Sequence, residues 1–171
     1  MWLLLLQILW FLAPAYIANG APVIIKGHTP IDRGKYLGKE RILGDGKTIE
    51  GFIGGALSGI LTGLILLFIQ EWLPISPTFK HNIFTILLLS IGAVSGDVLG
   101  SFIKRRLKIK RGAPCPLLDQ LDFLLFPLLV LMLTGKIFNL KIYLIMIILT
   151  IVLHVTTNYI AYKLKLKDVP W

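Results

Sequence analysis

The chain alternates between long apolar stretches and shorter polar segments. A helix that crosses a membrane needs about 20 consecutive residues that are mostly apolar. The apolar stretches come close to that length. They predict five transmembrane helices, over residues 2–18, 52–70, 82–103, 117–134 and 142–162. We therefore expect an all-α integral membrane protein in which residues 1–171 form a single polytopic domain.

The composition agrees with a membrane location. Of the 171 residues, 56% are hydrophobic, and the mean hydropathy of +0.79 is typical of membrane proteins. Cys115 is the only cysteine, which excludes an intrachain disulfide and a cysteine metal cluster. No basic segment precedes the first apolar stretch, so we interpret it as a membrane helix rather than a cleaved signal peptide.

Basic residues gather in three polar segments and predict the orientation of the chain. Short connections rich in Lys and Arg stay on the cytoplasmic side of a membrane. The connections 19–51 and 104–116 are rich in these residues, and the C-terminal segment adds Lys163, Lys165 and Lys167. We expect the N-terminus outside, the C-terminus in the cytoplasm, and two functional cytoplasmic loops at 19–51 and 104–116. The formal net charge of +9 is suited to binding anionic lipid headgroups or a polyphosphate. The alternative is that the basic residues only determine the orientation of the chain in the membrane.

Small residues recur at helical spacing in the second and third stretches. Such rows let two helices approach closely. The second stretch carries Gly51, Gly55, Gly59 and Gly63, and the third carries Gly92, Ala93, Gly96 and Gly100. We expect these two helices to pack against each other, and the alternative is a homodimer formed through either row.

Asp97 lies inside the otherwise apolar stretch 82–103. An Asp at the centre of a membrane helix costs about 2.5 to 3.5 kcal/mol, so this carboxylate needs a partner and indicates a functional site. At helical spacing Asp97, Ser101 and Lys104 share one face, because steps of four and seven residues return to nearly the same side. An acid, a hydroxyl and a base therefore line one surface.

A glycine-rich segment with polar side chains leads into the second stretch. Backbone N–H groups at a helix N-terminus bind phosphate, and Lys47 and Thr48 add side-chain donors. A Walker A loop is excluded because Arg41 stands where its first glycine is required. The alternative is a capped helix start in which Asp45 or Thr48 is only the N-cap. The expected phosphate-binding residues are Gly44, Asp45, Gly46, Lys47, Thr48, Glu50 and Gly51.

Asp119 and Asp122 open the fourth stretch on one helical face. Two neighbouring carboxylates repel each other unless a cation lies close to them. Mg²⁺ prefers oxygen ligands and binds through a few carboxylates together with substrate phosphates. With Asp97 as a third acid we predict a magnesium site, and the alternative is an acidic helix start favoured by the helix dipole.

The three histidines show no metal-ligand spacing along the chain. His154 lies in the fifth stretch close to Thr157 and Asn158. This group of polar side chains predicts an interhelical polar contact rather than a catalytic role.

Two segments together resemble the signatures of the CDP-diacylglycerol synthases, which are membrane cytidylyltransferases. One is Gly96-Asp97, then Ser101, then Lys104-Arg105, and the other is Lys47-Thr48-x-Glu50-Gly51. The five-stretch layout and the Gly-Asp-Gly-Lys-Thr-x-Glu-Gly segment resemble most closely the archaeal branch, the CDP-archaeol synthases, and this resemblance covers essentially the whole chain.

The chain departs from the bacterial and eukaryotic members of that family in one region. Those members carry a Pro-Gly-His-Gly-Gly segment that leads to Asp-Arg-x-x-Asp. Here residues 112–116 contain no histidine, and Asp119 and Asp122 are one residue closer together without the intervening Arg. We assign no role to Cys115.

The resemblance implies a reaction and a set of roles. CTP and 2,3-di-O-geranylgeranylglycerol 1-phosphate give unsaturated CDP-archaeol and pyrophosphate at the cell membrane, with the active site facing the cytoplasm and no nucleic acid involved. The lipid phosphate is anionic at neutral pH, so no strong general base is needed. The implied catalytic residues are Asp97, Lys104, Asp119 and Asp122, the further nucleotide-binding residues are Ser101, Lys104 and Arg105, and the implied Mg²⁺ ligands are Asp97, Asp119 and Asp122.

Two other functions stay open at this point. In a small cation- or proton-coupled transporter Asp97 would bind the transported ion, although no internal repeat is evident. A CDP-alcohol phosphotransferase would show Asp-x-x-Asp-Gly-x-x-Ala-Arg; Asp119 to Asp122 begin this pattern, but Phe123 replaces the glycine and no Ala-Arg follows. Thermal stabilisation by CTP is expected for the cytidylyltransferase.

Overall fold

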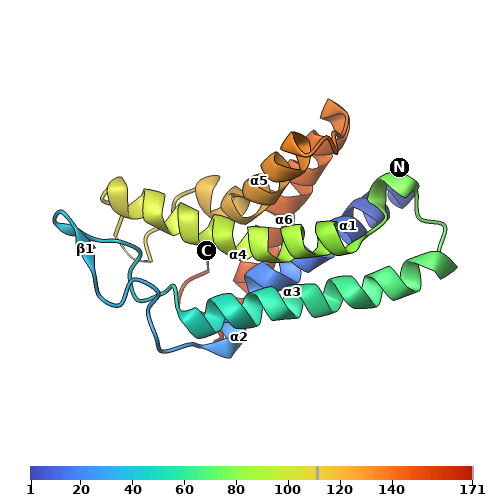
Figure 1. Ribbon diagram of the computed structural model, residues 1–171. Helices are drawn as coiled ribbons and strands as arrows, with labels where there is room; N and C mark the ends of the chain where they lie inside the picture. Colours follow the sequence, from blue (N-terminus) through green and yellow to red (C-terminus); the bar gives the residue numbers. More distant parts are fainter. Residues whose placement is uncertain (111, 171) are drawn as a thin grey trace.

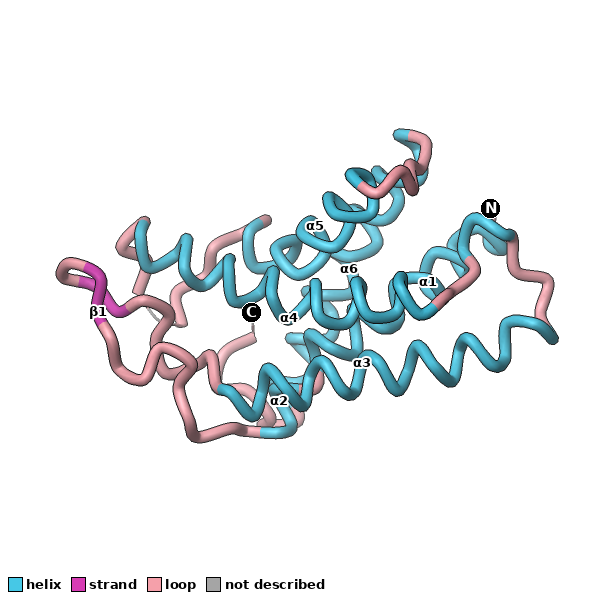
Figure 2. Tube along the Cα trace, in the orientation of Figure 1, coloured by secondary structure: helices cyan, strands magenta, loops and turns pink. Residues whose placement is uncertain are grey.

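The computed structural model describes residues 1–110 and 112–170 and consists mainly of helices in an elongated bundle (Figure 1). The long helices are α1 (Trp2–Gly20), α3 (Ile49–Ile69), α4 (Ile83–Arg106), α5 (Leu118–Leu133) and α6 (Leu140–Lys163). The shorter elements are α2 (Pro22–Ile25), strands β1 (Tyr36–Leu37) and β2 (Glu40–Arg41), and the 3-10 turns η1 (Gln70–Trp72) and η2 (Pro77–Phe79). Figure 2 shows the longest loop around β1, at the end of the bundle where α3 begins.

Each of the five apolar stretches forms a long helix, with ends that differ from the prediction by up to three residues. The helical segments long and apolar enough to cross a membrane are four in the described part of the chain: Trp2–Ile25, Ile49–Trp72, Ile83–Arg106 and Leu140–Lys163. Helix α5 has 16 residues. At 1.5 Å per residue it is about 24 Å long, shorter than a hydrocarbon core of about 30 Å. A fifth span therefore stays a prediction.

Apolar side chains cover the outside of the helices. On α3, Leu57, Leu61 and Phe68 are 60%, 61% and 77% exposed. On α6, only 11% of the apolar segment is buried within the protein. Water would disfavour an apolar surface of this extent, whereas lipid would not. The distribution is that of a multi-pass membrane protein.

Side-chain caps fix where three of the helices begin. The Thr48 hydroxyl accepts the Gly51 N–H at the start of α3, with 3.1 Å between oxygen and nitrogen. Asn82 and Thr85 form a reciprocal capping box at the start of α4. Asn139 accepts from the third residue of α6 in the same way. These caps satisfy N–H groups that have no partner inside the helix.

The glycine row of α3 packs on two helices. A methyl group at Gly55 or Gly59 would overlap backbone carbonyls of α1, and one at Gly63 would overlap Ile86 of α4. The expected contact between α3 and α4 is therefore confirmed, but α1 shares the row.

The glycines of α4 mostly serve another partner. Gly92, Gly96 and Gly100 face Pro127 and Asp122 of α5. Both rows are thus covered within the chain, and the homodimer stays a prediction without an assigned face.

Candidate active site

The carboxylate of Asp97 is paired with a lysine from a distant part of the sequence. Lys47 Nζ donates to Asp97 Oδ2 over 2.5 Å, and their side chains are 25% and 29% exposed. Lys47 lies just before α3, and Asp97 lies in the second half of α4. The Lys47 ammonium group is therefore the partner that Asp97 requires inside an apolar stretch. The contact joins the glycine-rich segment before α3 to the Asp97 motif of α4.

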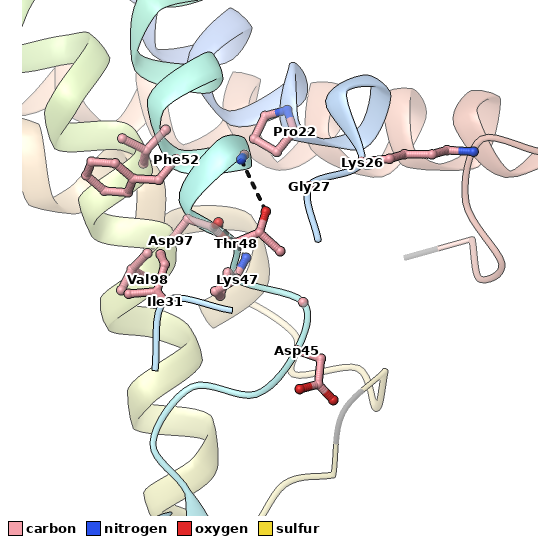
Figure 3. Close-up of a pocket in the computed structure, with 13 residues that line it drawn as sticks. Pro22, Lys26, Gly27, Ile31, Asp45, Lys47, Thr48, Phe52, Asp97 and Val98 are labelled. Atoms are coloured by element: carbon pink, nitrogen blue, oxygen red, sulfur yellow. Dashed lines mark hydrogen bonds and ion pairs between the residues drawn. The ribbon is translucent and has the colours of Figure 1, made fainter. Parts of the chain in front are cut away.

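The Lys47–Asp97 pair lies at a cleft of about 200 Å³ (Figure 3). The walls come from the loop before α3, the start of α3, the short helix α2 and one side of α4. Figure 3 shows Lys47 beside Asp97 and Thr48 turned toward the first turn of α3. The polar lining residues that were predicted from the sequence are Asp45, Gly46, Lys47, Thr48, Gly51 and Asp97. Thr48 is also the N-cap of α3, as the alternative interpretation required.

Glu50 does not line the cleft but holds the loop that forms one of its walls. Its carboxylate accepts the hydroxyl of Thr29 at 2.6 Å and the N–H of Thr29 at 3.1 Å. Gly27 passes so close to Thr48 and Glu50 that a methyl group there would overlap both side chains. Glu50 was predicted to bind nucleotide; in this structure its contacts are those of a residue that positions the wall.

Asp32 is the centre of the loop between α2 and α3, a role that the sequence did not reveal. Its side chain is fully buried, and it accepts the guanidinium of Arg41 at 2.7 Å and the N–H groups of Gly34, Leu43 and Gly44. The hydrogen bond from Arg41 is the main reason that the pKa of the Asp32 carboxyl lies well below its usual range. Gly44, predicted as a nucleotide ligand, thus uses its N–H to shape the loop.

A β-hairpin extends this loop toward the end of α4. The strands β1 and β2 pair Tyr36 with Arg41 and Leu37 with Glu40. Arg106, in the last turn of α4, donates to the carbonyl oxygens of Leu37 and Arg41, each over 2.7 Å. The hairpin is therefore attached to the same helix that carries Asp97.

A second lysine–carboxylate pair lies near the end of α4. Lys104 Nζ donates to Asp119 Oδ1 over 2.7 Å, and both side chains are less than one-fifth exposed. The other oxygen of Asp119 accepts the N–H of Cys115 at 2.8 Å. The Asp119 carboxylate therefore holds both the Lys104 side chain and the backbone segment that precedes α5.

Asp122 fits into space left by the glycines of α4. A methyl group at Gly100 would overlap its carboxylate, and one at Gly96 would overlap its backbone carbonyl. Gly100 follows Asp97 by three residues on α4, so the Asp122 side chain lies about one helical turn from Asp97 along that helix. Three carboxylates and two lysines thus form a charged cluster over the ends of α3, α4 and α5, composed of Lys47, Asp97, Lys104, Asp119 and Asp122.

The predicted magnesium ligands are not gathered around one point. Within residues 1–110 and 112–170, no three His, Cys, Asp or Glu side chains are close enough to hold a metal ion together. Asp97 and Asp119 each contact a lysine ammonium instead. The Mg²⁺ site therefore stays a prediction.

Ser101 and Arg105 complete the predicted motif on α4. Ser101 is buried, at 5% exposure. The Nε atom of Arg105 is buried and has no hydrogen-bond partner among residues 1–110 and 112–170. Neither residue lines the cleft beside Asp97. Their assignment to nucleotide binding stays a prediction.

Helix α6 contributes side chains that the sequence did not assign to the site. His154 is hydrogen-bonded to Asn158 of the same helix, and its ring stacks on Phe123 of α5 with 6.1 Å between centroids. The expected interhelical polar contact is therefore wrong: the polar contact lies within α6, and the contact between helices is aromatic. Beyond α6, Lys167 donates to Asn158 Oδ1 over 2.5 Å. Burial and the charge of Lys47 lower the pKa of the Lys167 ammonium.

Similar proteins point to one enzyme family. The sequence model of the CarS-like family, CDP-archaeol synthase, matches residues 1–171. The CDP-archaeol synthase of Picrophilus torridus is 42% identical over 99% of this chain and 98% of its own length. Those of Archaeoglobus fulgidus and Methanopyrus kandleri are 44% and 45% identical, over 98% and 99% of this chain and 98% and 95% of theirs.

A solved structure of an intramembrane enzyme for archaeal membrane lipid biosynthesis shares the fold. It superposes with a TM-score of 0.77 at 36% identity, over 88% of this chain and 91% of that chain. The similarities support neither the transporter nor the phosphotransferase alternative.

Proposed function

Because the chain belongs to the CDP-archaeol synthase family, we propose that it is a membrane cytidylyltransferase. Its substrates are CTP and 2,3-di-O-geranylgeranylglycerol 1-phosphate, and its products are unsaturated CDP-archaeol and pyrophosphate. The observation that carries the proposal is the Lys47–Asp97 contact. It places the cytidylyltransferase-like motif of α4 against the glycine-rich segment before α3, at the wall of an open cleft.

The reaction requires two anions to approach each other. A phosphate oxygen of the lipid attacks the α-phosphorus of CTP, a new P–O bond forms, and the bond to the β-phosphate oxygen breaks as pyrophosphate leaves. Catalysis consists mainly of positioning and of stabilising negative charge. Lys47 and Lys104 offset the negative charge when their ammonium groups move from their carboxylate partners to phosphate oxygens, and Arg105 adds a third cation.

The chemistry of three carboxylates fits a divalent cation, which would have to draw them together from their positions in this structure. Asp97, Asp119 and Asp122 are oxygen donors of the kind that Mg²⁺ prefers, and two of them already attract a cation in the form of a lysine ammonium. Asp122 packs against Gly100, three residues after Asp97 on α4, and a cation there would offset repulsion between the two carboxylates. When bound there, Mg²⁺ would neutralise charge on the triphosphate and on the leaving pyrophosphate.

The proposed orientation follows from the basic residues. Helix α5 serves as a fifth span, the N-terminus lies outside, and the C-terminus and the loops 19–51 and 104–116 lie in the cytoplasm, where CTP is found. The charged cluster then faces the cytoplasmic surface of the cell membrane. The prenyl chains of the lipid remain among the apolar helices.

The decisive experiment follows label from CTP into lipid. Purified protein is incubated with Mg²⁺, α-labelled CTP and geranylgeranyl ether-lipid phosphate, and radioactivity is counted in the organic phase. The matched control replaces the lipid phosphate by the same lipid alcohol, which lacks the attacking group. We expect label only with the phosphate. A folded protein that labels neither this lipid nor other lipid phosphates, with CTP or other nucleotides, would refute the proposal.

A chelator tests the metal in the same assay. We expect EDTA to reduce incorporation to background and added Mg²⁺ to restore it. Incorporation that persists in EDTA would remove Mg²⁺ from the mechanism without affecting the assignment of the reaction.

A further inference from the structure

One face of α6 carries polar side chains at four-residue spacing, in a helix that is otherwise mostly apolar. These residues are Thr150, His154 and Asn158. The Thr150 hydroxyl donates to Met146 O over 2.7 Å and lies 2.8 Å from the Tyr16 hydroxyl of α1. The polar face is therefore turned toward the rest of the protein, and the hydroxyl of Thr150 already has its partners.

The hydrogen bonds between Asn158 and His154 leave one donor of the histidine ring unused. Asn158 Nδ2 donates to His154 O over 2.8 Å and lies 3.1 Å from both ring nitrogens. An amide nitrogen only donates, so it bonds the ring nitrogen that carries no proton, and the other nitrogen of the neutral imidazole keeps an N–H group. That N–H group has no acceptor among residues 1–110 and 112–170. A half-buried donor of this kind favours an acceptor that a ligand supplies.

The His154 ring is separated from the charged cluster by a single side chain. It stacks on Phe123 of α5, with 6.1 Å between centroids. The backbone of Phe123 packs on Gly96 of α4, where a methyl group would lie 3.0 Å from the Phe123 Cα atom. Gly96 immediately precedes Asp97, and Phe123 immediately follows Asp122. These contacts place His154 beside the part of the cluster that contains Asp97 and Asp122.

The place of His154 on α6 indicates a ligand that comes from the bilayer. His154 is nine residues before Lys163, the last residue of α6, so it lies about 14 Å from that end of the helix. Among the four long apolar segments of the described chain, the segment of α6 is the least buried, at 11%. A molecule that lies among lipid chains therefore reaches this histidine more directly than a nucleotide at the cleft beside α3.

We propose that His154 is a substrate-binding residue whose ring N–H donates to the phosphate group of the lipid substrate. This inference rests on the proposed function, in which that phosphate attacks CTP beside the charged cluster. A hydrogen bond to an anionic oxygen is stronger than one to a neutral acceptor, so the phosphate suits this donor. Asn158 is the positioning residue, because its amide bonds the unprotonated ring nitrogen.

The test compares His154→Phe with His154→Gln and with Thr156→Val. Phenylalanine keeps an aromatic ring that can stack on Phe123 but lacks the donor, and glutamine keeps a side-chain N–H. Thr156 is exposed on the opposite side of α6, and its hydroxyl bonds the helix itself. Each protein is assayed for the KM of the lipid phosphate and of CTP, for its affinity without CTP toward the lipid phosphate and the same lipid alcohol, and for its melting temperature.

The expected result for His154→Phe is an increase of about tenfold in the KM for the lipid phosphate. Its affinity for the lipid phosphate should fall by a similar factor, while the KM for CTP, the affinity for the lipid alcohol and the melting temperature change little. His154→Gln should recover part of the loss, and Thr156→Val should behave as wild type. An unchanged KM for the lipid phosphate in His154→Phe, or a change confined to CTP, would overturn the inference.

Failure of the proposed function has a different signature. A wild-type protein that binds the lipid phosphate but transfers no cytidylyl group refutes the function. The affinities of His154→Phe for the phosphate and for the alcohol still decide the inference in that case. If His154 has only a structural role, His154→Phe should weaken the binding of both lipids alike and lower the melting temperature, which would also overturn the inference.

Discussion

The two ends of helix α4 are stabilised in different ways. A cluster of aromatic rings lies near its start, which we call the aromatic end. The rings of Phe11, Phe79 and Phe138 have centroid distances of 5.6–6.2 Å, and the His81 ring stacks on Phe11. Near its other end, the charged cluster depends on two ion pairs. One helix thus connects a closely packed aromatic region, where the ammonium group of Lys136 lies over the Phe11 ring, with a region of concentrated charge.

The aromatic end and the charged cluster are expected to serve different properties of the protein, stability and reactivity. Phe11 is fully buried and His81 is 3% exposed, so the aromatic end is stabilised mainly by packing between rings. The Lys47–Asp97 pair is about one-quarter exposed. Full burial of such a pair would be costly and would keep the lysine from an incoming phosphate. We therefore expect substitutions at the two ends to affect different measurements.

The largest effect is expected for Asp97→Asn. Loss of this carboxylate should lower kcat by about 10³-fold, because a charge that organises the site is removed, while the melting temperature changes little. Incorporation of labelled CTP into lipid measures the first quantity and thermal unfolding the second. The control is Glu71→Gln, which breaks the exposed Lys80–Glu71 pair outside the charged cluster and should alter neither. Near-normal turnover in Asp97→Asn would refute the catalytic role assigned to Asp97.

Phe11→Ala should give the reverse result. A cavity within the aromatic cluster costs about 3 kcal/mol of stability, which corresponds to a fall in melting temperature of about 6–12 °C. The folded fraction should keep its kcat, since Phe11 touches none of the charged cluster. Phe68→Ala is the control, because Phe68 is 77% exposed on α3. A loss of kcat in folded Phe11→Ala would show that the two ends are coupled.

Gly100→Ala tests whether Asp122 must stay where the glycine places it. The added methyl group would displace the carboxylate, and a misplacement on the order of 1 Å costs about 10²-fold in rate. Gly20→Ala adds the same group where no atom lies within 4 Å, so it should remain fully active. Equal activity of both variants would mean that Asp122 does not act in catalysis.

The smallest effect concerns the pH dependence of the aromatic end. Burial lowers the pKa of His81, and the nearby Lys136 charge adds to that shift. Because the unfolded chain takes up this proton first, stability is fully present above about pH 6.5 and is lost as the pH falls toward the folded pKa.

Melting temperatures of wild type and His81→Gln between pH 8 and pH 5 measure this contribution. The wild type should lose a few degrees more than the variant, about what 1 kcal/mol gives in a domain of this size. Parallel curves for the two proteins would contradict it.

The helices and the need for a partner at Asp97 were accessible from the sequence for physical reasons. Apolar stretches as long as a membrane is thick leave few alternatives to a helix. A carboxylate inside such a stretch is costly enough to demand a partner, so Asp97 indicated the site before its partner was known. The partnership of Lys47 with Asp97 followed only from the folded chain, because the two residues are 50 positions apart.

The residues that were not predicted do not stand at positions where their side chains would obviously cost free energy. Asp32 stands in a polar loop, where an acid is unremarkable, and its burial depends on the turns that Gly34 and Gly44 form around it. Lys167 reaches Asn158 through a left-handed residue at Lys165, and a lysine gives no sign of that conformation. His154 was assigned to the wrong kind of contact because spacing does not show which ring will face it.

The attachment of the hairpin to Arg106 also sets an order of events during synthesis and folding of the chain. Arg106 follows Leu37 by 69 positions in the chain. At about 5–20 residues per second the ribosome needs roughly 3 to 14 s to make that length. During this interval the nascent loop already exists beside the membrane without the guanidinium that secures its hairpin. Assembly of the candidate active site therefore waits for α4, which supplies both Asp97 and Arg106.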